Sequence, residues 1–124
     1  MRSIAAVMAL TVLVVGFSYS LAEDAETKKP KHTIKNVMKM AHKDGLLKKV
    51  SGGDASQDEK IELLDLYISL VDNKPKKGEA DSWSKLSGAA ALAAAKVVTG
   101  REDGVAELKK ATNCKACHSV HKPA

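Results

Sequence analysis

The 124-residue chain is poor in aromatic residues, which make up 3% of it: one tryptophan, two tyrosines and one phenylalanine. Large aromatic side chains usually supply much of the buried apolar area, so their scarcity predicts a thin core. The lysines are scattered among acidic residues, and no aromatics are interleaved with them. This pattern disfavours nucleic-acid binding, although the formal net charge is +5.

The chain has one long apolar run, and it lies close to the N-terminus at residues 4–17. Arg2 precedes this run, and small residues occupy the −3 and −1 positions of a cut after Ala22. This arrangement predicts a cleavable secretory signal peptide at residues 1–22. The alternative is a membrane anchor, but the run is shorter than the ~20 apolar residues that span a bilayer. No cysteine near the cut offers a site for a lipid anchor.

Removal of the signal leaves about 100 residues, which suits a single domain. Residues 23–31 are polar and lack periodicity, so we expect a flexible leader before a domain at 32–124. We expect this exported, periplasmic chain to be soluble. Its mature part keeps only Tyr67 and Trp83 as aromatics. A flat apolar cofactor that buries a few hundred Å² would add several kcal/mol, at about 25 cal/mol per Å².

Apolar residues recur at helical spacing in four segments, and no segment resembles a strand. A capping box at Ser56 and Glu59 marks the start of the second helix. Asp81 or Ser82 can cap the third, and Gly100 can end it. The expected helices are 32–50, with a weak point at residues 44–45, then 57–72, 82–99 and 101–122. Their short connections predict an all-α, antiparallel up-down-up-down four-helix bundle.

The sequence Cys114-Lys115-Ala116-Cys117-His118 is the strongest chemical signal in the chain. Cys-x-x-Cys-His is typical of covalent haem c attachment, in which two thiols bond the two haem vinyl groups. On a helix Cys114 and Cys117 share a face, and His118 can bind the iron as the proximal axial ligand.

Three alternatives compete with haem at this motif. A disulfide between Cys114 and Cys117 would close too short a loop to stabilise much. A thioredoxin-like redox pair needs a βαβ setting, which an all-helical chain lacks. Zinc could take Cys114, Cys117 and His118 or His121, but ligands so tightly bunched are unusual for zinc.

The first helix can supply a distal ligand to the iron, because its start lies beside the end of the last helix in such a bundle. Ile34, Met38 and His42 recur every four residues and share one face. Met38 and His42 are therefore the candidate distal axial ligands, with Met40 or an open site as alternatives. Each has an ordinary interpretation too, since an apolar-face methionine is usually core and His42 lies among lysines.

The remaining polar residues have plainer interpretations. We expect His32 at the surface and His121 facing solvent or the haem edge. Lys122 could pair with a haem propionate or be merely solvated. The stripe of Lys35, Lys39 and Lys43 could dock an acidic redox partner. An ordinary solvated face is the more common case, with possible pairing to Glu59, Glu62 and Asp65.

With its signal peptide, four helices and C-terminal Cys114–His118 motif, the chain resembles the cytochrome c′ group of class II c-type cytochromes. The resemblance covers residues 32–122 as architecture and only the motif as sequence. It implies thioether bonds at Cys114 and Cys117, a proximal His118 and a distal residue from 38–42. Val120 and His121 stand where the group often has an aromatic, and His42 departs from its usual apolar or Met distal position.

These observations predict a monohaem electron carrier that serves redox partner proteins, and they leave a homodimer open. The alternative function is binding of a small gas such as nitric oxide at a five-coordinate iron. No distal acid–base pair is visible in the sequence, so we expect no enzyme.

Overall fold

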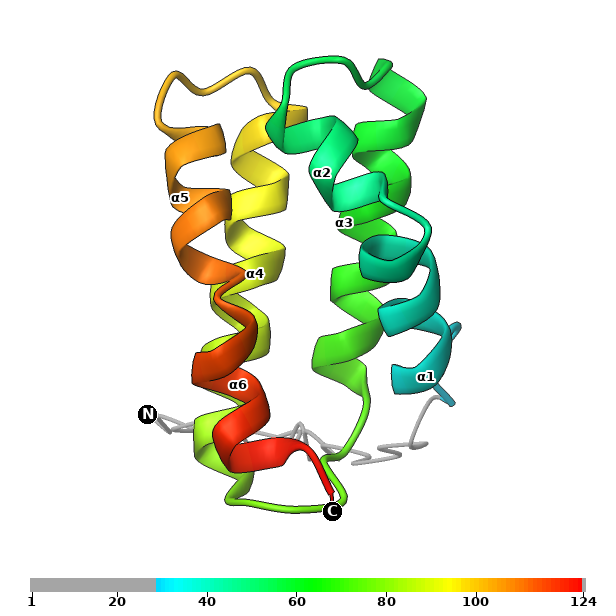
Figure 1. Cartoon of the computed structure of the whole chain (residues 1–124), viewed down its shortest axis with the longest axis vertical. Helices are drawn as coiled ribbons and strands as arrows, with labels where there is room; N and C mark the ends of the chain where they lie inside the picture. Colours follow the sequence, from blue (N-terminus) through cyan, green and yellow to red (C-terminus); the bar gives the residue numbers. More distant parts are fainter. Residues whose placement is uncertain (1–28, 124) are drawn as a thin grey trace, which may run out of the picture.

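A computed structural model describes residues 29–123, and every regular element in this range is helical (Figure 1). The all-α prediction is therefore confirmed for this part of the chain. The predicted signal peptide at 1–22 and the leader up to residue 28 lie outside the described residues. The elements are α1 (Ile34–Val37), the π-helix η1 (Met38–Lys43), α2 (Leu46–Ser51), α3 (Gln57–Asp72), α4 (Ala80–Val98), α5 (Gly104–Ala111) and α6 (Cys114–His121).

The two longest helices, α3 and α4, pack side by side and run in opposite directions (Figure 1). The predicted capping box is confirmed: Ser56 Oγ accepts from the Glu59 N–H at 3.2 Å. The Glu59 carboxylate accepts from the Ser56 N–H at 2.8 Å. Helix α4 starts at Ala80, slightly earlier than expected, and Gly100 follows its end with φ +72°.

The predicted first helix is not continuous. It consists of α1, which continues directly into η1, and of α2. The break between η1 and α2 lies at Gly45, which adopts a left-handed φ of +86° that few other residues tolerate. Before that break, the chain widens into the π-helix, in which the Asp44 N–H donates to the Lys39 carbonyl at 2.8 Å. The weak point expected at residues 44–45 is thus a true interruption, whereas nothing in the sequence indicated the π-helix.

The prediction of one helix from residue 101 to 122 is wrong. The Thr112 hydroxyl donates to the Leu108 carbonyl at 2.6 Å, and Asn113 is extended. The Asn113 side chain then accepts from the Ala116 N–H at 3.3 Å and caps the new helix α6. Short polar side chains that bond the nearby backbone favour caps over helix interiors, which explains the break.

The core lies between α3 and α4 and is completed by the outer helices. The α1–α2 segment packs on α3, whereas α5 and α6 pack on α4 (Figure 1). Trp83 donates its indole N–H to the Leu70 carbonyl at 3.1 Å. Four of the thirteen buried core residues in the described part of the chain are alanines. The thirteen are Val37, Ala41, Val50, Leu63, Leu66, Tyr67, Leu70, Trp83, Ala90, Ala93, Ala94, Val97 and Leu108.

Within residues 29–123, no helix combines the length and the apolar character that crossing a membrane requires.

Candidate functional site

A cavity of about 440 Å³ opens between the α1–η1–α3 side of the molecule and the α4–α6 side. It brings together residues from both ends of the domain that the sequence had singled out. The predicted site residues among its lining are Met38, His42, Cys114, Cys117 and His118. The rest of the lining is mainly apolar and includes Ile34, Tyr67, Leu70, Trp83, Leu86 and Ala90.

Helix α6 presents the motif to this cavity. Cys114 is its first residue, and the Asn113 cap fixes where the helix begins. Residues three and four apart share a helix face, so Cys114, Cys117 and His118 all reach the cavity lining. The predicted common face of the two cysteines is confirmed.

The structure gives the state of the two thiols and the arrangement of the side chains that could bind a metal. Both cysteines are free thiols, so no disulfide joins them. Burial, and secondarily the charge of Cys114, raises the pKa of the Cys117 thiol. No group of three or more His, Cys, Asp or Glu side chains in the described part of the chain is arranged to hold a metal ion.

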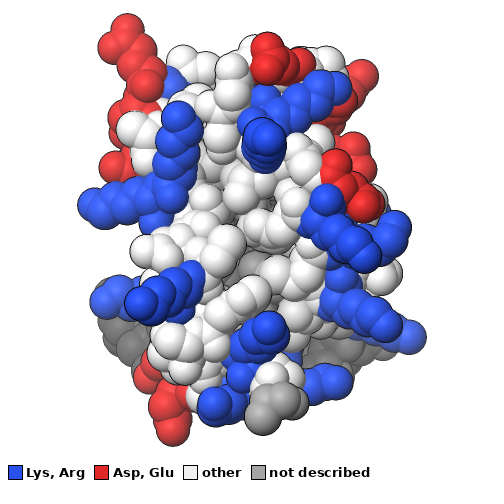
Figure 2. Space-filling view, viewed as in Figure 1, with Lys and Arg blue, Asp and Glu red and all other residues white. Residues whose placement is uncertain are grey.

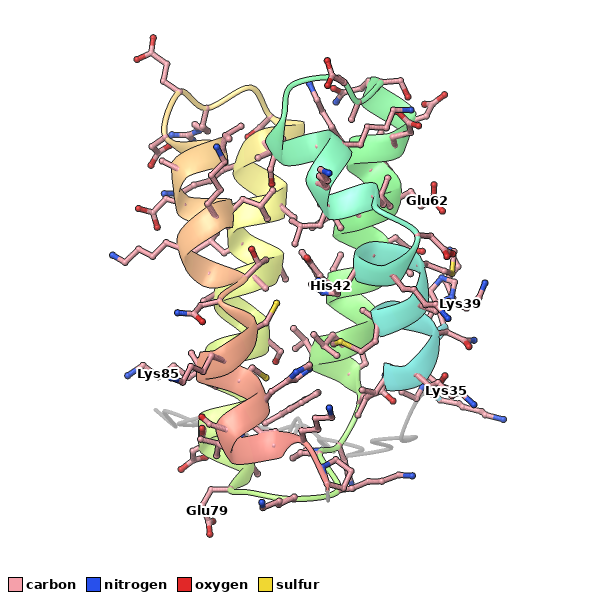
Figure 3. All side chains as sticks on the ribbon, viewed as in Figure 1. Lys35, Lys39, His42, Glu62, Glu79 and Lys85 are labelled. Atoms are coloured by element: carbon pink, nitrogen blue, oxygen red, sulfur yellow. The ribbon has the colours of Figure 1, made fainter. Side chains whose placement is uncertain are left out.

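The π-helix supplies the facing side of the site. Ile34, Met38 and His42 all line the cavity, as their four-residue spacing predicted. Figure 3 shows His42 reaching toward the middle of the molecule, whereas Lys35 and Lys39 point away from it. Single π-helical turns occur frequently at functional sites. Met40 lines a separate, polar cavity, so it is the weakest of the three ligand candidates.

His42 is half-buried, and its ring lies 6.0 Å from the Tyr67 ring between centroids, with the planes tilted by 38°. Burial, followed by the charge of His118, lowers the pKa of His42. The imidazole is therefore neutral at neutral pH and keeps a nitrogen lone pair that can bind a metal or accept a proton. His42 and His118 both line the same cavity.

Tyr67 also lines the cavity, although it was not among the predicted site residues. It is 1% exposed, and its hydroxyl has no hydrogen-bond partner among the described residues. Burial, and secondarily the charge of Cys114, raises the pKa of Tyr67, so the hydroxyl keeps its proton. An unsatisfied buried hydroxyl costs about 1–3 kcal/mol. The scarcity of aromatics was the one sequence signal that could have drawn attention to this tyrosine.

His121 was expected to face solvent or the haem edge. It is only 5% exposed and lines the cavity, so the solvent-facing alternative is wrong. Its Nδ1–H donates to the Lys77 carbonyl at 2.8 Å, and its Nε2 lies 3.0 Å from the Ser82 hydroxyl. The ring also meets Trp83 edge-on, with centroids 5.3 Å apart. His121 thus joins the last turn of α6 to the loop between α3 and α4 and to the first turn of α4, at the border of the cavity.

The lysine stripe does not pair as the sequence suggested. Lys39 pairs with Asp44 at 3.5 Å, while Glu59 pairs with Lys49. Lys43 and Lys122 instead border the cavity. Figure 2 shows basic side chains on both flanks of an uncharged central strip that is hollowed near its middle.

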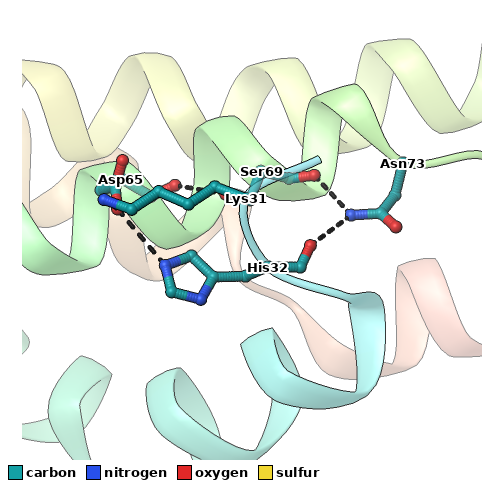
Figure 4. Close-up of polar contacts among 5 residues, drawn as sticks. All are labelled: Lys31, His32, Asp65, Ser69 and Asn73. Carbon is teal, nitrogen blue, oxygen red and sulfur yellow. Dashed lines mark hydrogen bonds and ion pairs between the residues drawn. The ribbon is translucent and has the colours of Figure 1, made fainter. Parts of the chain in front are cut away.

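His32, expected at the surface, is partly buried and belongs to a polar cluster that ties the start of α1 to α3 (Figure 4). Asp65 accepts from Lys31 at 2.7 Å and lies 3.4 Å from His32 Nε2. The Asn73 amide donates to the carbonyls of His32 and Ser69, at 2.8 and 2.6 Å. These contacts hold Ile34, Met38 and His42 at the cavity by fixing the element that carries them.

Comparison with known proteins finds no matching family profile, no matching curated protein and no matching solved structure. The site is therefore interpreted from its own residues.

Proposed function

We propose that this protein is an exported monohaem c-type cytochrome that transfers electrons between redox partner proteins. One observation carries the proposal: Cys114, Cys117 and His118 share one face of α6 and line a largely apolar cavity. The cavity volume of about 440 Å³ lies within the range of cofactor sites. Met38 and His42 face the motif from the other side of the same cavity.

Each residue has a distinct role in this proposal. The Cys114 and Cys117 thiols form the two thioether bonds, and His118 binds the iron through a ring nitrogen. Met38 or His42 provides the sixth ligand, and the surrounding apolar side chains exclude water. When bound, the haem supplies one-electron chemistry between ferric and ferrous iron. No residue is assigned a catalytic role, and the protein is not proposed to be an enzyme.

The proposal includes a four-helix bundle with up-down-up-down order. Its four arms are the α1–α2 segment, α3, α4 and the α5–α6 segment. Helix packing supports this arrangement, because each outer arm contacts one of the two central helices. The proposal also includes a signal peptide that directs export to the compartment where haem c is attached and that is cleaved after Ala22.

The direct test is covalent haem attachment during export in a host with c-type cytochrome maturation. We expect a haem stain that persists on a denaturing gel and a pyridine haemochrome spectrum of two thioether bonds. The variant C114A/C117A should lose both signals, whereas the matched variant Lys115→Ala, inside the same motif, should keep them. A wild-type protein that carries no covalent haem would sink the proposal.

An absorption spectrum of the ferrous protein tests electron transfer against gas binding. A six-coordinate, low-spin spectrum that resists carbon monoxide is the expected result. A five-coordinate spectrum that changes at once on adding carbon monoxide would favour the gas-binding function. Substitution of Met38 and His42 in turn identifies the sixth ligand by the variant that becomes high-spin.

A further inference from the structure

The Tyr67 hydroxyl stands out among the polar groups of the cavity because nothing satisfies it. It projects from α3 in the buried part of the site and has no hydrogen-bond partner among residues 29–123. Buried polar groups in folded proteins nearly always have a partner, so this one indicates a contact that forms when the site is filled.

Four other polar side chains that line the cavity are already engaged. Ser87 donates to the Trp83 carbonyl at 2.6 Å, and Thr112 donates to the Leu108 carbonyl. Asn113 caps α6, and both nitrogens of His121 have partners. None of these groups is directed to the Tyr67 hydroxyl. His118, Cys114 and Cys117, which also line the cavity, would be occupied by the haem in the proposed function.

The His42 ring lies beside that of Tyr67, which is also within range of the charge of Cys114. The centroids of the two rings are 6.0 Å apart, and η1 packs directly on α3. A neutral imidazole has one N–H donor and one acceptor nitrogen, whereas a phenol both donates and accepts. The two groups therefore suit each other whether or not one nitrogen of His42 is bound to iron.

We propose that, in the haem-loaded protein, the Tyr67 hydroxyl hydrogen-bonds to the His42 imidazole and fixes how His42 meets the distal face of the haem. Tyr67 is then a positioning residue that acts through His42. This inference rests on the proposed function, since it concerns the site when haem is bound. Groups that hold an axial ligand or its neighbour tune the potential of the iron.

The test is a double-mutant cycle on the covalently loaded protein, with the reduction potential as its readout. Tyr67→Phe removes only the hydroxyl and keeps the ring, so the fold and haem content should be retained. We expect it to change the reduction equilibrium constant by about threefold to tenfold, the range for loss of one hydrogen bond. In an H42A background, the same substitution should have less than half of this effect.

The matched control is Ser69→Ala, which removes a buried hydroxyl from the same helix that donates to the Asp65 carbonyl, away from the cavity. It should leave the potential unchanged. An unchanged potential in Y67F overturns the inference, as does an effect that keeps half or more of its size without His42. If haem attaches normally and either result appears, only the inference fails. If wild-type protein takes up no haem, the proposed function and the inference both fail.

Discussion

Gly78 lies directly against the buried ring of His121, so a side chain added at this position should destabilise the fold. Its φ is +87°, and a Cβ there would lie 2.5 Å from Nδ1 of His121. We expect Gly78→Ala to cost ~1–2 kcal/mol from the left-handed backbone, and a further ~1–3 kcal/mol from overpacking against the ring. Urea denaturation of the loaded protein measures the loss.

Gly53 offers a matched control for that substitution. Its φ of +85° is nearly the same, but an added Cβ meets nothing within 4 Å. Gly53→Ala should therefore show the backbone cost alone. Equal losses of stability at the two positions would mean that the contact with His121 contributes nothing.

At the scale of the element, the capping box sets where α3 begins and how firmly its first turn is held. Replacement of Ser56 by alanine leaves the Glu59 N–H without its acceptor, and we expect it to destabilise the protein by ~1 kcal/mol. Ser84→Ala, at an exposed position inside α4, is the control and should change stability by less than ~0.5 kcal/mol. Thermal unfolding followed by circular dichroism compares the two, and matching midpoints would contradict the role of the cap.

Acid should weaken the contacts that hold the start of α1 against α3, because they depend on the ionised carboxylate of Asp65. The hydrogen bond from Lys31, with a smaller contribution from His32, lowers the pKa of Asp65 from its ordinary value of 3.8. The ionised carboxylate is thus favoured in the folded state. Its stabilisation is complete well above pH 3.8 and is lost as the pH falls through the lower, folded-state pKa.

The variant Asp65→Asn isolates that contribution. Because the Asp65 side chain is 37% exposed, we expect a loss of no more than ~1 kcal/mol at neutral pH. The difference from wild type should shrink below about pH 4, where the unfolded carboxyl takes up a proton while the folded one is still ionised. Urea titrations at several pH values measure it, and a difference that grows on acidification would mean that the ionised carboxylate does not stabilise the fold.

Some helix boundaries could be predicted from the sequence, and others could not. The start of α3 was predicted because a capping box is a local signal, carried by Ser56 and Glu59 themselves. The break before α6 was missed, since Thr112 and Asn113 can also lie inside a helix and only their bonds to Leu108 and Ala116 decide the matter. The π-helix left no mark on the sequence pattern, because it adds a residue to one turn without changing the residue types.

The parts of the candidate site that depend on residues close together in the sequence could be predicted. Cys114, Cys117 and His118 are recognised by spacing alone, and the shared face of Met38 and His42 follows from helical periodicity. The environment of His121 was not predictable, because its partners Lys77 and Ser82 lie about forty residues away in the chain. The unsatisfied hydroxyl of Tyr67 was equally hidden, since burial without a partner is a property of the folded chain.

At the scale of the whole molecule, the cavity is continuous with a core rich in small residues. Ala90, Ala93 and Ala94 occupy central positions where a larger domain would carry bulky side chains. The C114A/C117A variant cannot retain covalent haem. We therefore expect its free energy of unfolding to be lower than that of wild type by the several kcal/mol that a buried porphyrin contributes, and its unfolding temperature to fall accordingly. A haem-free variant that is fully helical and equally stable would show that the bundle needs no cofactor.

The charge distribution of the whole molecule predicts which reductants reach the site fastest. Lys43 and Lys122 border the cavity, and other basic side chains flank it on the same face (Figure 2). A small anionic reductant should reduce the haem faster than a cationic one of similar potential, and salt should remove the advantage, because the Debye length is only about 10 Å at 0.1 M.

Replacement of single lysines by neutral glutamine tests which of them attract the anionic reductant. Lys43→Gln and Lys122→Gln should slow the anionic reductant in stopped-flow experiments at low salt, since each removes a positive charge at the mouth of the site. Lys35→Gln makes the same change in charge on a side chain that points away from His42 (Figure 3), so it should slow the reaction less. Equal slowing by all three variants would assign the effect to net charge, because only a local field distinguishes a lysine at the cavity from one on the outer face.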